Sequence, residues 1–244
     1  YRRVVQLHHI SLQLFEKVLQ VENTGNHLFL VHTSKNKYTT RNVVVATGFY
    51  DIPNLLNIPG EGLSKVTHYY NDPHYYALQK VAVIGGNNSA VDAALETWRK
   101  GAEVTMVMRE EDIGQRVKYW VRPDIVNRIA EGSIKVYTGS VITNIRSNEI
   151  DILTAGRCIT IENNFVIAAT GYMPDFGLLQ NMGVEISGDE KKIPVYNPEN
   201  MQTNVCGIYL AGVVCGGMET HKWFIENSRE HAEKVINSIV SEKQ

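Results

Sequence analysis

The chain has 244 residues, 43% of them hydrophobic and 20% charged, which excludes disordered and fibrous proteins. The 24 Lys and Arg residues nearly balance the 26 Asp and Glu residues, so the net charge of -2 predicts no unspecific binding to nucleic acid or to a membrane. Three widely spaced cysteines, Cys158, Cys206 and Cys215, form neither a disulfide framework nor a metal-ligand cluster, which favours the reducing cytoplasm and predicts no metal site.

The first quarter of the chain predicts strands and turns. Apolar residues over 14–21 and 28–33 flank the turn-forming residues 23–26, a pattern typical of a β-hairpin. An apolar run over 42–48 then ends in Thr-Gly and predicts a buried strand. Proline and glycine over 59–62 break both helix and strand patterns, so we expect a hinge there.

The middle of the chain predicts a β-α-β unit. A short apolar strand over 80–85 precedes a helix over 89–100, whose apolar residues follow a 3.6-residue period, and a second strand over 103–108. Proline near a first turn indicates another helix over 123–130. Short alternating stretches over 134–161 predict a small antiparallel meander.

The last third of the chain repeats an earlier pattern. Residues 165–171 form an apolar run that ends in Thr-Gly, as residues 42–48 do. A further strand over 207–212 leads through a glycine-rich turn into a helix over 221–241. We therefore expect the unit over 67–163 to be inserted between two pieces of another domain.

A candidate dinucleotide fingerprint lies between the strand and the helix of the β-α-β unit. Such a site needs a tight turn with little side chain, so that backbone N–H groups and the positive helix end can hold a pyrophosphate. Asparagine replaces the middle glycine of the usual pattern, and asparagine tolerates left-handed backbone. An ordinary strand-turn-helix is the alternative. The candidate residues are Gly85, Gly86, Asn87, Asn88, Ser89 and Ala90.

The residue after the second strand indicates which nicotinamide nucleotide binds. NAD sites usually offer a carboxylate there, whereas this chain has Arg109, whose guanidinium suits a 2′-phosphate. Arg116 and Lys118 in the next loop could join it. Because residues 110–112 are all acidic, a surface ion-paired arginine remains the alternative. The predicted cofactor is NADPH.

Three glycine-ended segments, at 46–48, 168–175 and 208–212, resemble the two-dinucleotide-binding-domain flavoprotein superfamily that includes thioredoxin reductases. The resemblance implies an α/β fold with two Rossmann-like, three-layer dinucleotide-binding domains. An NADPH domain over 67–163 would then be inserted into an FAD domain over 1–66 and 164–244. Val213 stands where that superfamily usually has an aspartate that binds the flavin ribityl chain. The implied FAD residues at the strand ends are Thr47, Gly48, Gly171, Gly212 and Val213.

Finer motifs resemble the bacillithiol-disulfide reductase family along nearly the whole chain. They lie at residues 68–76, 85–90, 118–120, 210–214 and 224–227. The resemblance implies that the chain matches the C-terminal three quarters of a family member. The amino-terminal FAD-binding segment and the proposed redox cysteine would then lie upstream of Tyr1, so the catalytic residue is unknown.

The sequence allows two interpretations for residues 68–76, for Cys215 and for residues 222–224. Residues 68–76 contain no Cys-x-x-Cys pair, which argues against thioredoxin reductase itself, and their tyrosines and histidines would line a pocket or pack around a hinge. Cys215 is interpreted as a buried packing residue, the alternative being a reactive thiol. Near the predicted helix entry, Lys222, Trp223 and Phe224 would lie against the flavin, with helix capping as a compatible role.

These patterns predict an FAD-containing, NADPH-dependent reductase of a small-molecule disulfide such as bacillithiol disulfide, acting as a homo-oligomer. Hydride would pass from nicotinamide to flavin, and two electrons from there to the disulfide. One alternative is a ferredoxin or flavodoxin NADP reductase of the thioredoxin-reductase-like type, which also lacks the cysteine pair. Another is a nucleotide-binding module without activity.

Overall fold

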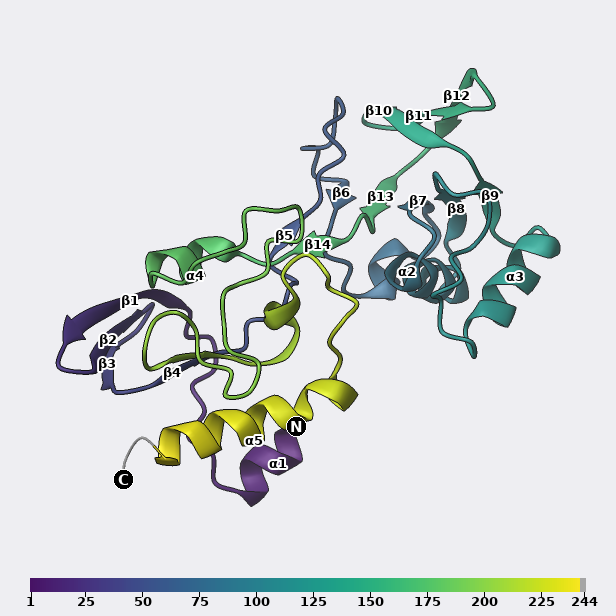
Figure 1. Ribbon diagram of the computed structural model, residues 1–244. Helices are drawn as coiled ribbons and strands as arrows, with labels where there is room; N and C mark the ends of the chain where they lie inside the picture. Colours follow the sequence, from purple (N-terminus) through teal and green to yellow (C-terminus); the bar gives the residue numbers. More distant parts are fainter. Residues whose placement is uncertain (242–244) are drawn as a thin grey trace. The chain divides into compact units, whose positions relative to one another are not determined.

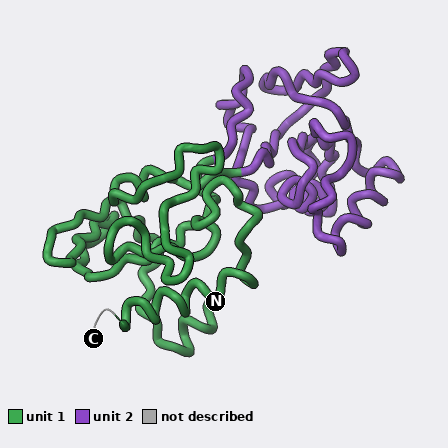
Figure 2. Tube along the Cα trace, viewed as in Figure 1, with its two compact units in different colours: residues 1–52, 172–244 green, residues 53–171 purple. Residues whose placement is uncertain are grey.

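The computed structural model describes residues 1–241 and divides into two compact units (Figure 2). One unit contains residues 1–52 and 172–244, and the other contains residues 53–171. The chain therefore passes between them at 52–53 and at 171–172, and the second unit is inserted in the sequence of the first. The predicted boundaries at 66/67 and 163/164 are wrong, because strands beyond both of them belong to the 53–171 unit.

A parallel five-stranded sheet forms the centre of the 53–171 unit (Figure 1). Its strand order is β6-β13-β7-β8-β9, and every neighbouring pair is parallel. The predicted strands over 80–85 and 103–108 are confirmed as β7 and β8. The bounds are β6 Val66–Thr67, β13 Phe165–Ala168, β7 Lys80–Ile84, β8 Glu103–Val107 and β9 Lys135–Tyr137.

Helices cover one face of this sheet. Helix α2 spans Asn88–Arg99 and buries its apolar stripe, including Val91 and Leu95, in a core shared with Met106 of β8. The same core contains Ile125 of α3, which spans Arg122–Ala130, and Tyr76 of the short 3-10 helix η1, Pro73–Tyr76. Both predicted helices are therefore confirmed to within one residue at each end.

A three-stranded antiparallel sheet covers the other face. It consists of β10 (Val141–Ile145), β11 (Glu149–Thr154) and β12 (Arg157–Glu162), in that order. Ile150 and Ile152 are fully buried against Ala82 of β7 and Val107 of β8. The meander is therefore confirmed over 141–162. The stretch at 135–137 was predicted within it but joins the parallel sheet as β9, because its backbone pairs with β8.

Two further expectations are corrected in this unit. The run over 165–171 was assigned to the other domain, yet β13 pairs with β7 from Phe165↔Val81 to Ala168↔Ile84. The predicted hinge over 59–62 lies within the unit. Ile145 of β10 donates a backbone hydrogen bond to the Pro59 carbonyl at 3.0 Å, so this segment is held against the meander.

The other unit begins with helix α1 (Arg2–Leu7) and an antiparallel sheet of β1 (Val18–Gly25), β2 (Leu28–Thr33) and β3 (Lys37–Thr40). The predicted hairpin is confirmed, but its turn is at Asn26 and His27 rather than over 23–26. Both residues have positive φ, at 52° and 57°, as a two-residue turn that matches strand twist requires. Residues 14–17 precede β1 and are not part of it.

A parallel pair of strands, β4 and β15, lies in the core of the same unit. Tyr209 and Leu210 of β15 are fully buried beside Val235 of α5. The last helix begins at Ile225, four residues later than predicted. The pair β5–β14 lies where the chain passes between the units. Bounds are β4 Val43–Val45, β5 Ile52–Pro53, β14 Tyr172–Met173, α4 Phe176–Asn181, β15 Ile208–Leu210, η2 Gly212–Gly216 and α5 Ile225–Ser241.

Candidate dinucleotide-binding sites

The turn between β7 and α2 contains two glycines, and the first of them has room for glycine only. Gly85 has a φ of +119°, and a Cβ atom there would lie 2.8 Å from the carbonyl oxygen of Ala169. A Cβ on Gly86 would lie 2.8 Å from the sulfur of Met108. The backbone conformation and the backbone contact explain why position 85 needs glycine, as the fingerprint predicts, whereas the contact at position 86 is with a flexible side chain that can move.

The amino end of α2 is open to a ligand. Asn87 is the N-cap residue, but its side chain makes no capping hydrogen bond to the helix. The N–H groups of a first helical turn have no partner within the helix, and the helix dipole makes this end positive. A twelve-residue helix that starts directly after two glycines therefore fits a pyrophosphate group.

A cavity of about 400 Å³ lies at the carboxyl edge of the parallel sheet, beside this turn. Parallel α/β sheets bind ligands at this edge, because the strand ends and helix starts meet there. Gly85, Gly86 and Asn87 contribute to its lining. The other lining residues are Asn54, Leu55, Leu56, Ile84, Val107, Arg109, Glu110, Ser140, Val141, Ile142, Ala169 and Thr170.

Arg109 follows β8 and lines this cavity. Within residues 1–241 its guanidinium makes no ion pair, and the acidic neighbour Asp112 pairs with Arg122 at 3.1 Å instead. The alternative of an ion-paired surface arginine is therefore not realised. An unpaired cation beside a glycine turn is available for an anionic group of a ligand.

The other predicted residues of this region lie outside the cavity lining. Lys118 pairs with Asp92 of α2 at 2.9 Å, and Arg116 is exposed. Asn88 binds the loop that carries both, accepting from the Lys118 N–H at 2.9 Å and donating to the Arg116 carbonyl at 3.0 Å. Ala90 is buried at 1% exposure and would contact a Cβ on Gly85, so its role is packing, while Ser89 is exposed.

One wall of the cavity depends on a carboxylate that sequence reasoning missed. Glu61 accepts backbone hydrogen bonds from Leu56 at 2.6 Å and Asn57 at 2.8 Å, and it lies 3.1 Å from Nε2 of His68. Both side chains of that last pair are largely buried. Glu61 thereby holds the segment that places Leu55 and Leu56 on the cavity. Its neighbours Pro59, Gly60 and Gly62 were the signal, but they were interpreted as a hinge.

Glu61→Gln is expected to raise the Michaelis constant for NADPH and change kcat little. The amide would present N–H groups where two backbone donors need acceptors, so the wall loses at least one charge-assisted hydrogen bond, worth about 1.5–3 kcal/mol. Steady-state kinetics would check this, with Glu149→Gln on β11 as the matched control. An unchanged Michaelis constant for NADPH would show that Glu61 does not hold the wall.

Two predicted flavin-binding segments meet at one edge in the unit 1–52 and 172–244. Strands β4 and β15 are parallel neighbours, with Val45 opposite Leu210. Thr47 and Gly48 follow β4, and Gly212 and Val213 follow β15, so both turns leave the same edge. Gly171, predicted with them, belongs to the 53–171 unit, where its carbonyl accepts from Asn54 at 3.0 Å.

Trp223 supports a ligand at this edge. Its indole Nε1 is buried and has no hydrogen-bond partner within residues 1–241. The ring lies beside Gly216 of η2, and Nζ of Lys222 is 5.5 Å from the ring centroid. An unsatisfied buried donor is costly, so Trp223 fits a group that brings acceptor atoms, as FAD does. Phe224 instead donates its N–H to Asn227 at 2.6 Å ahead of α5.

His231 of α5 holds the turn that follows β15. It is 1% exposed, and its Nδ1 accepts a hydrogen bond from the Gly212 N–H at 3.1 Å. An accepting Nδ1 requires a neutral ring with its proton on Nε2, and burial lowers the pKa of His231. The sulfur of Cys215 lies 3.8 Å from the same nitrogen, and burial raises the pKa of this thiol to about 12. A protonated, buried thiol favours packing as the role of Cys215.

His231 is expected to make the protein less stable as pH falls. The unfolded chain takes up a proton near the usual histidine pKa of about 6.5, whereas the folded protein does so only at lower pH, so acid favours unfolding. His231→Asn keeps an acceptor but does not titrate, and should flatten the pH dependence of the unfolding midpoint between about pH 7 and 5. Equal slopes in the variant and the parent would contradict this role.

The tyrosine-rich segment at 68–76 is used mainly for packing. Tyr76 is buried in the helical core, and Tyr70 packs beside it and donates to Glu96 of α2 at 2.8 Å. Tyr75 is exposed and makes edge contacts with Tyr76 and Phe165.

Within residues 1–241, no three His, Cys, Asp or Glu side chains are grouped for a metal. None of the helices described there has the length and apolar character to cross a bilayer.

Comparison with known proteins agrees with this geometry. Residues 1–212 match the family described as pyridine nucleotide-disulphide oxidoreductase. The chain is 40% identical to bacilliredoxin reductase Bdr of Bacillus subtilis over 240 residues, which cover 98% of this chain and 74% of that protein.

Two further proteins are similar. The solved bacillithiol disulfide reductase Bdr of Staphylococcus aureus has a TM-score of 0.93 and 36% identity, and the match covers 100% of this chain and 76% of that one. A ferredoxin–NADP reductase of Ignicoccus hospitalis is 26% identical over 204 residues, or 81% of this chain and 64% of that protein. The chain belongs to the bacillithiol disulfide reductase family of pyridine nucleotide-disulphide oxidoreductases.

Proposed function

We propose that the chain acts in an FAD-containing, NADPH-dependent reductase of a low-molecular-weight disulfide, bacillithiol disulfide. The observation that carries the proposal is the unpaired Arg109 in the cavity beside the glycine turn. It supports an NADPH-dependent member of a family whose similar proteins are named for the reduction of bacillithiol disulfide or of bacilliredoxin.

Each unit has a separate task in this proposal. The unit 53–171 is the NADPH domain, in which the amino end of α2 binds the pyrophosphate and Arg109 binds the 2′-phosphate. The unit 1–52 and 172–244 is the FAD domain, and both are Rossmann-like. Thr47, Gly212 and Trp223 would hold the flavin cofactor there. Bound FAD supplies two-electron redox chemistry that protein side chains do not provide.

The test is NADPH consumption by the FAD-loaded enzyme with bacillithiol disulfide as acceptor. Turnover with this disulfide, and little with ferredoxin, is the expected result. The reverse preference would favour the alternative function, a ferredoxin or flavodoxin NADP reductase. That alternative is supported by the absence of a Cys-x-x-Cys pair from residues 68–76 and by the similarity to ferredoxin–NADP reductases.

A purified protein without a visible flavin spectrum would indicate a nucleotide-binding module instead of an enzyme. The cytoplasmic location and the homo-oligomer also stay predictions. Sedimentation of the FAD-loaded protein would determine its oligomeric state.

Cys215→Ala is expected to keep most of the disulfide reductase activity. Burial keeps this thiol protonated, and only a thiolate attacks a disulfide at a useful rate. Turnover with bacillithiol disulfide would check this, with the exposed Cys158→Ala as control. A loss of about a thousandfold would identify Cys215 as a nucleophile and reject its packing role.

A further inference from the structure

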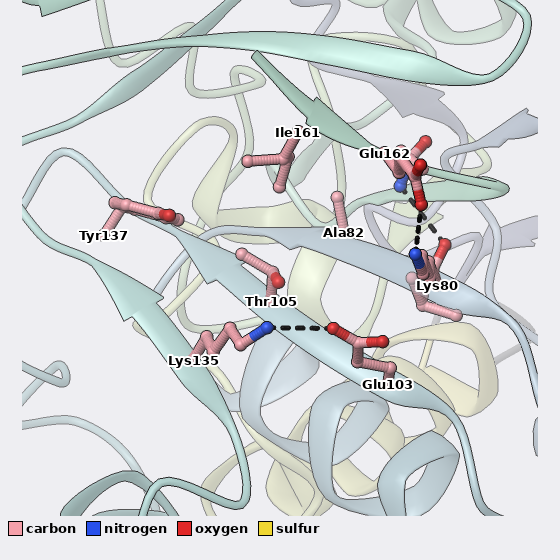
Figure 3. A pocket seen from close by; sticks show the side chains of 10 residues that line it. Lys80, Ala82, Glu103, Thr105, Lys135, Tyr137, Ile161 and Glu162 are labelled. Carbon is pink, nitrogen blue, oxygen red and sulfur yellow. Dashed lines mark hydrogen bonds and ion pairs between the residues drawn. The ribbon is translucent and has the colours of Figure 1, made fainter. Parts of the chain in front are cut away.

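A second cavity lies at the amino end of the parallel sheet, opposite the edge that carries Arg109 (Figure 3). Its volume is about 260 Å³, below the roughly 300–1,000 Å³ typical of drug-sized ligands, so it suits a small molecule. None of the residues that the nucleotide proposal uses contributes to it. The lining residues are Lys80, Val81, Ala82, Glu103, Thr105, Lys135, Tyr137, Ile161, Glu162 and Asn163.

Side chains that alternate between the two faces of the adjacent strands β7, β8 and β9 form one side of this cavity. Lys80 pairs in register with Glu103, and Ala82 with Thr105, which in turn pairs with Lys135. Side chains two residues apart on a strand share a face, so these groups all rise from the face that the meander covers further along. Figure 3 shows them on neighbouring strands, with Ile161 and Glu162 of β12 opposite.

The charges at this cavity neutralise one another. Lys80 pairs with Glu162, and Lys135 pairs with Glu103 at 2.9 Å, as the dashed lines in Figure 3 show. Two lysines and two glutamates leave the lining without net charge. A lining without net charge attracts neither anions nor cations, so the cavity favours an uncharged ligand.

Three polar groups of the lining have no partner. The Asn163 side chain is 2% exposed and donates through Nδ2 to the Phe165 carbonyl at 2.7 Å, which fixes the amide, while its buried Oδ1 accepts nothing within residues 1–241. In the same range the hydroxyls of Thr105 and Tyr137 make no hydrogen bond, although Thr105 is only 7% exposed. Of these three groups only Asn163 Oδ1 is a buried atom, and buried polar atoms normally have partners, so this acceptor beside two hydroxyls that are not engaged by the protein points to a ligand.

We propose that this cavity binds a small, uncharged polyhydroxyl molecule, no larger than a monosaccharide. Its hydroxyls would donate to Asn163 Oδ1 and exchange hydrogen bonds with Thr105 and Tyr137, since an O–H group is both donor and acceptor. The methyl of Ala82, the side chain of Ile161 and the tyrosine ring offer apolar contact for its C–H groups. The proposal does not depend on the function of the nucleotide cavity.

The test uses the FAD-loaded enzyme with isotope-labelled alanine and isoleucine methyl groups, titrated with glucose and myo-inositol. At least one of the two is expected to shift the Ala82 and Ile161 signals saturably and leave Ala93, on the opposite face of the sheet, unchanged. Thr105→Val and Tyr137→Phe should each weaken binding about fivefold, the effect of one lost hydrogen bond. The exposed Tyr119→Phe is the matched control and should bind as the parent does.

Charge is tested with glucosamine and glucuronate, which should bind more weakly than glucose. No saturable shift of Ala82 or Ile161 with either neutral probe would overturn the proposal. Parent-like affinity in both Thr105→Val and Tyr137→Phe, or tighter binding of a charged probe, would overturn it as well. Unchanged NADPH consumption in the variants would show that they are folded, because neither residue lies at the nucleotide cavity.

Discussion

Replacing Arg109 with alanine is expected to raise the Michaelis constant for NADPH by roughly 10- to 150-fold and to leave that for NADH nearly unchanged. The guanidinium lines the cavity and has no ion pair within residues 1–241, so it is free to bind a 2′-phosphate. A hydrogen bond to a charged group contributes about 1.5–3 kcal/mol, which sets the size of the effect. NADH lacks the 2′-phosphate and therefore loses no such contact.

The measurement is steady-state kinetics with both nucleotides for each variant. Arg116→Ala is the matched control, because Arg116 is exposed and does not line the cavity. Arg109→Lys should recover part of the NADPH affinity, since it keeps the charge and loses the planar fork. An equal loss for NADPH and NADH in Arg109→Ala would reject the assignment of the 2′-phosphate to this residue.

Gly85→Ala is expected to destabilise the protein by about 2–5 kcal/mol and to abolish NADPH binding at ordinary concentrations. The backbone φ of +119° is unfavourable for any residue with a Cβ atom, and the new methyl would lie 2.8 Å from the Ala169 carbonyl oxygen. Because that carbonyl belongs to the backbone beyond β13, relief requires the turn itself to move. Moving the turn displaces the N–H groups that would bind the pyrophosphate.

Gly132→Ala is the control for backbone strain. Gly132 also has positive φ, at +79°, but a Cβ there would have no neighbour within 4 Å, so only about 1–2 kcal/mol is expected. Denaturant unfolding and NADPH titration of both variants provide the comparison. Equal destabilisation by the two substitutions would mean that the contact with Ala169 has no energetic importance.

Local sequence patterns were sufficient to predict the β-α-β unit around the turn between β7 and α2. The apolar run of β7, the 3.6-residue stripe of α2 and the glycines at 85 and 86 act within a few residues of each other, so they are visible in the chain itself. The same holds for Arg109, whose position after β8 indicated that it lies beside this turn. Glu61 was not predicted, although the backbone N–H groups it accepts from lie only four and five residues away, because no sequence pattern shows which backbone groups a carboxylate binds.

The sequence by itself therefore determined the glycine turn and the arginine after β8, because these depend on residues close together in the chain. Motifs and strand patterns spread along the chain determined the family and the insertion of one unit in another. Tertiary structure alone decided the strand order. Two apolar runs with the same Thr-Gly ending joined different sheets, β4 beside β15 and β13 beside β7. Apolar composition states only that a strand is buried, whereas its neighbours are set by hydrogen-bond pairing and side-chain packing between distant segments.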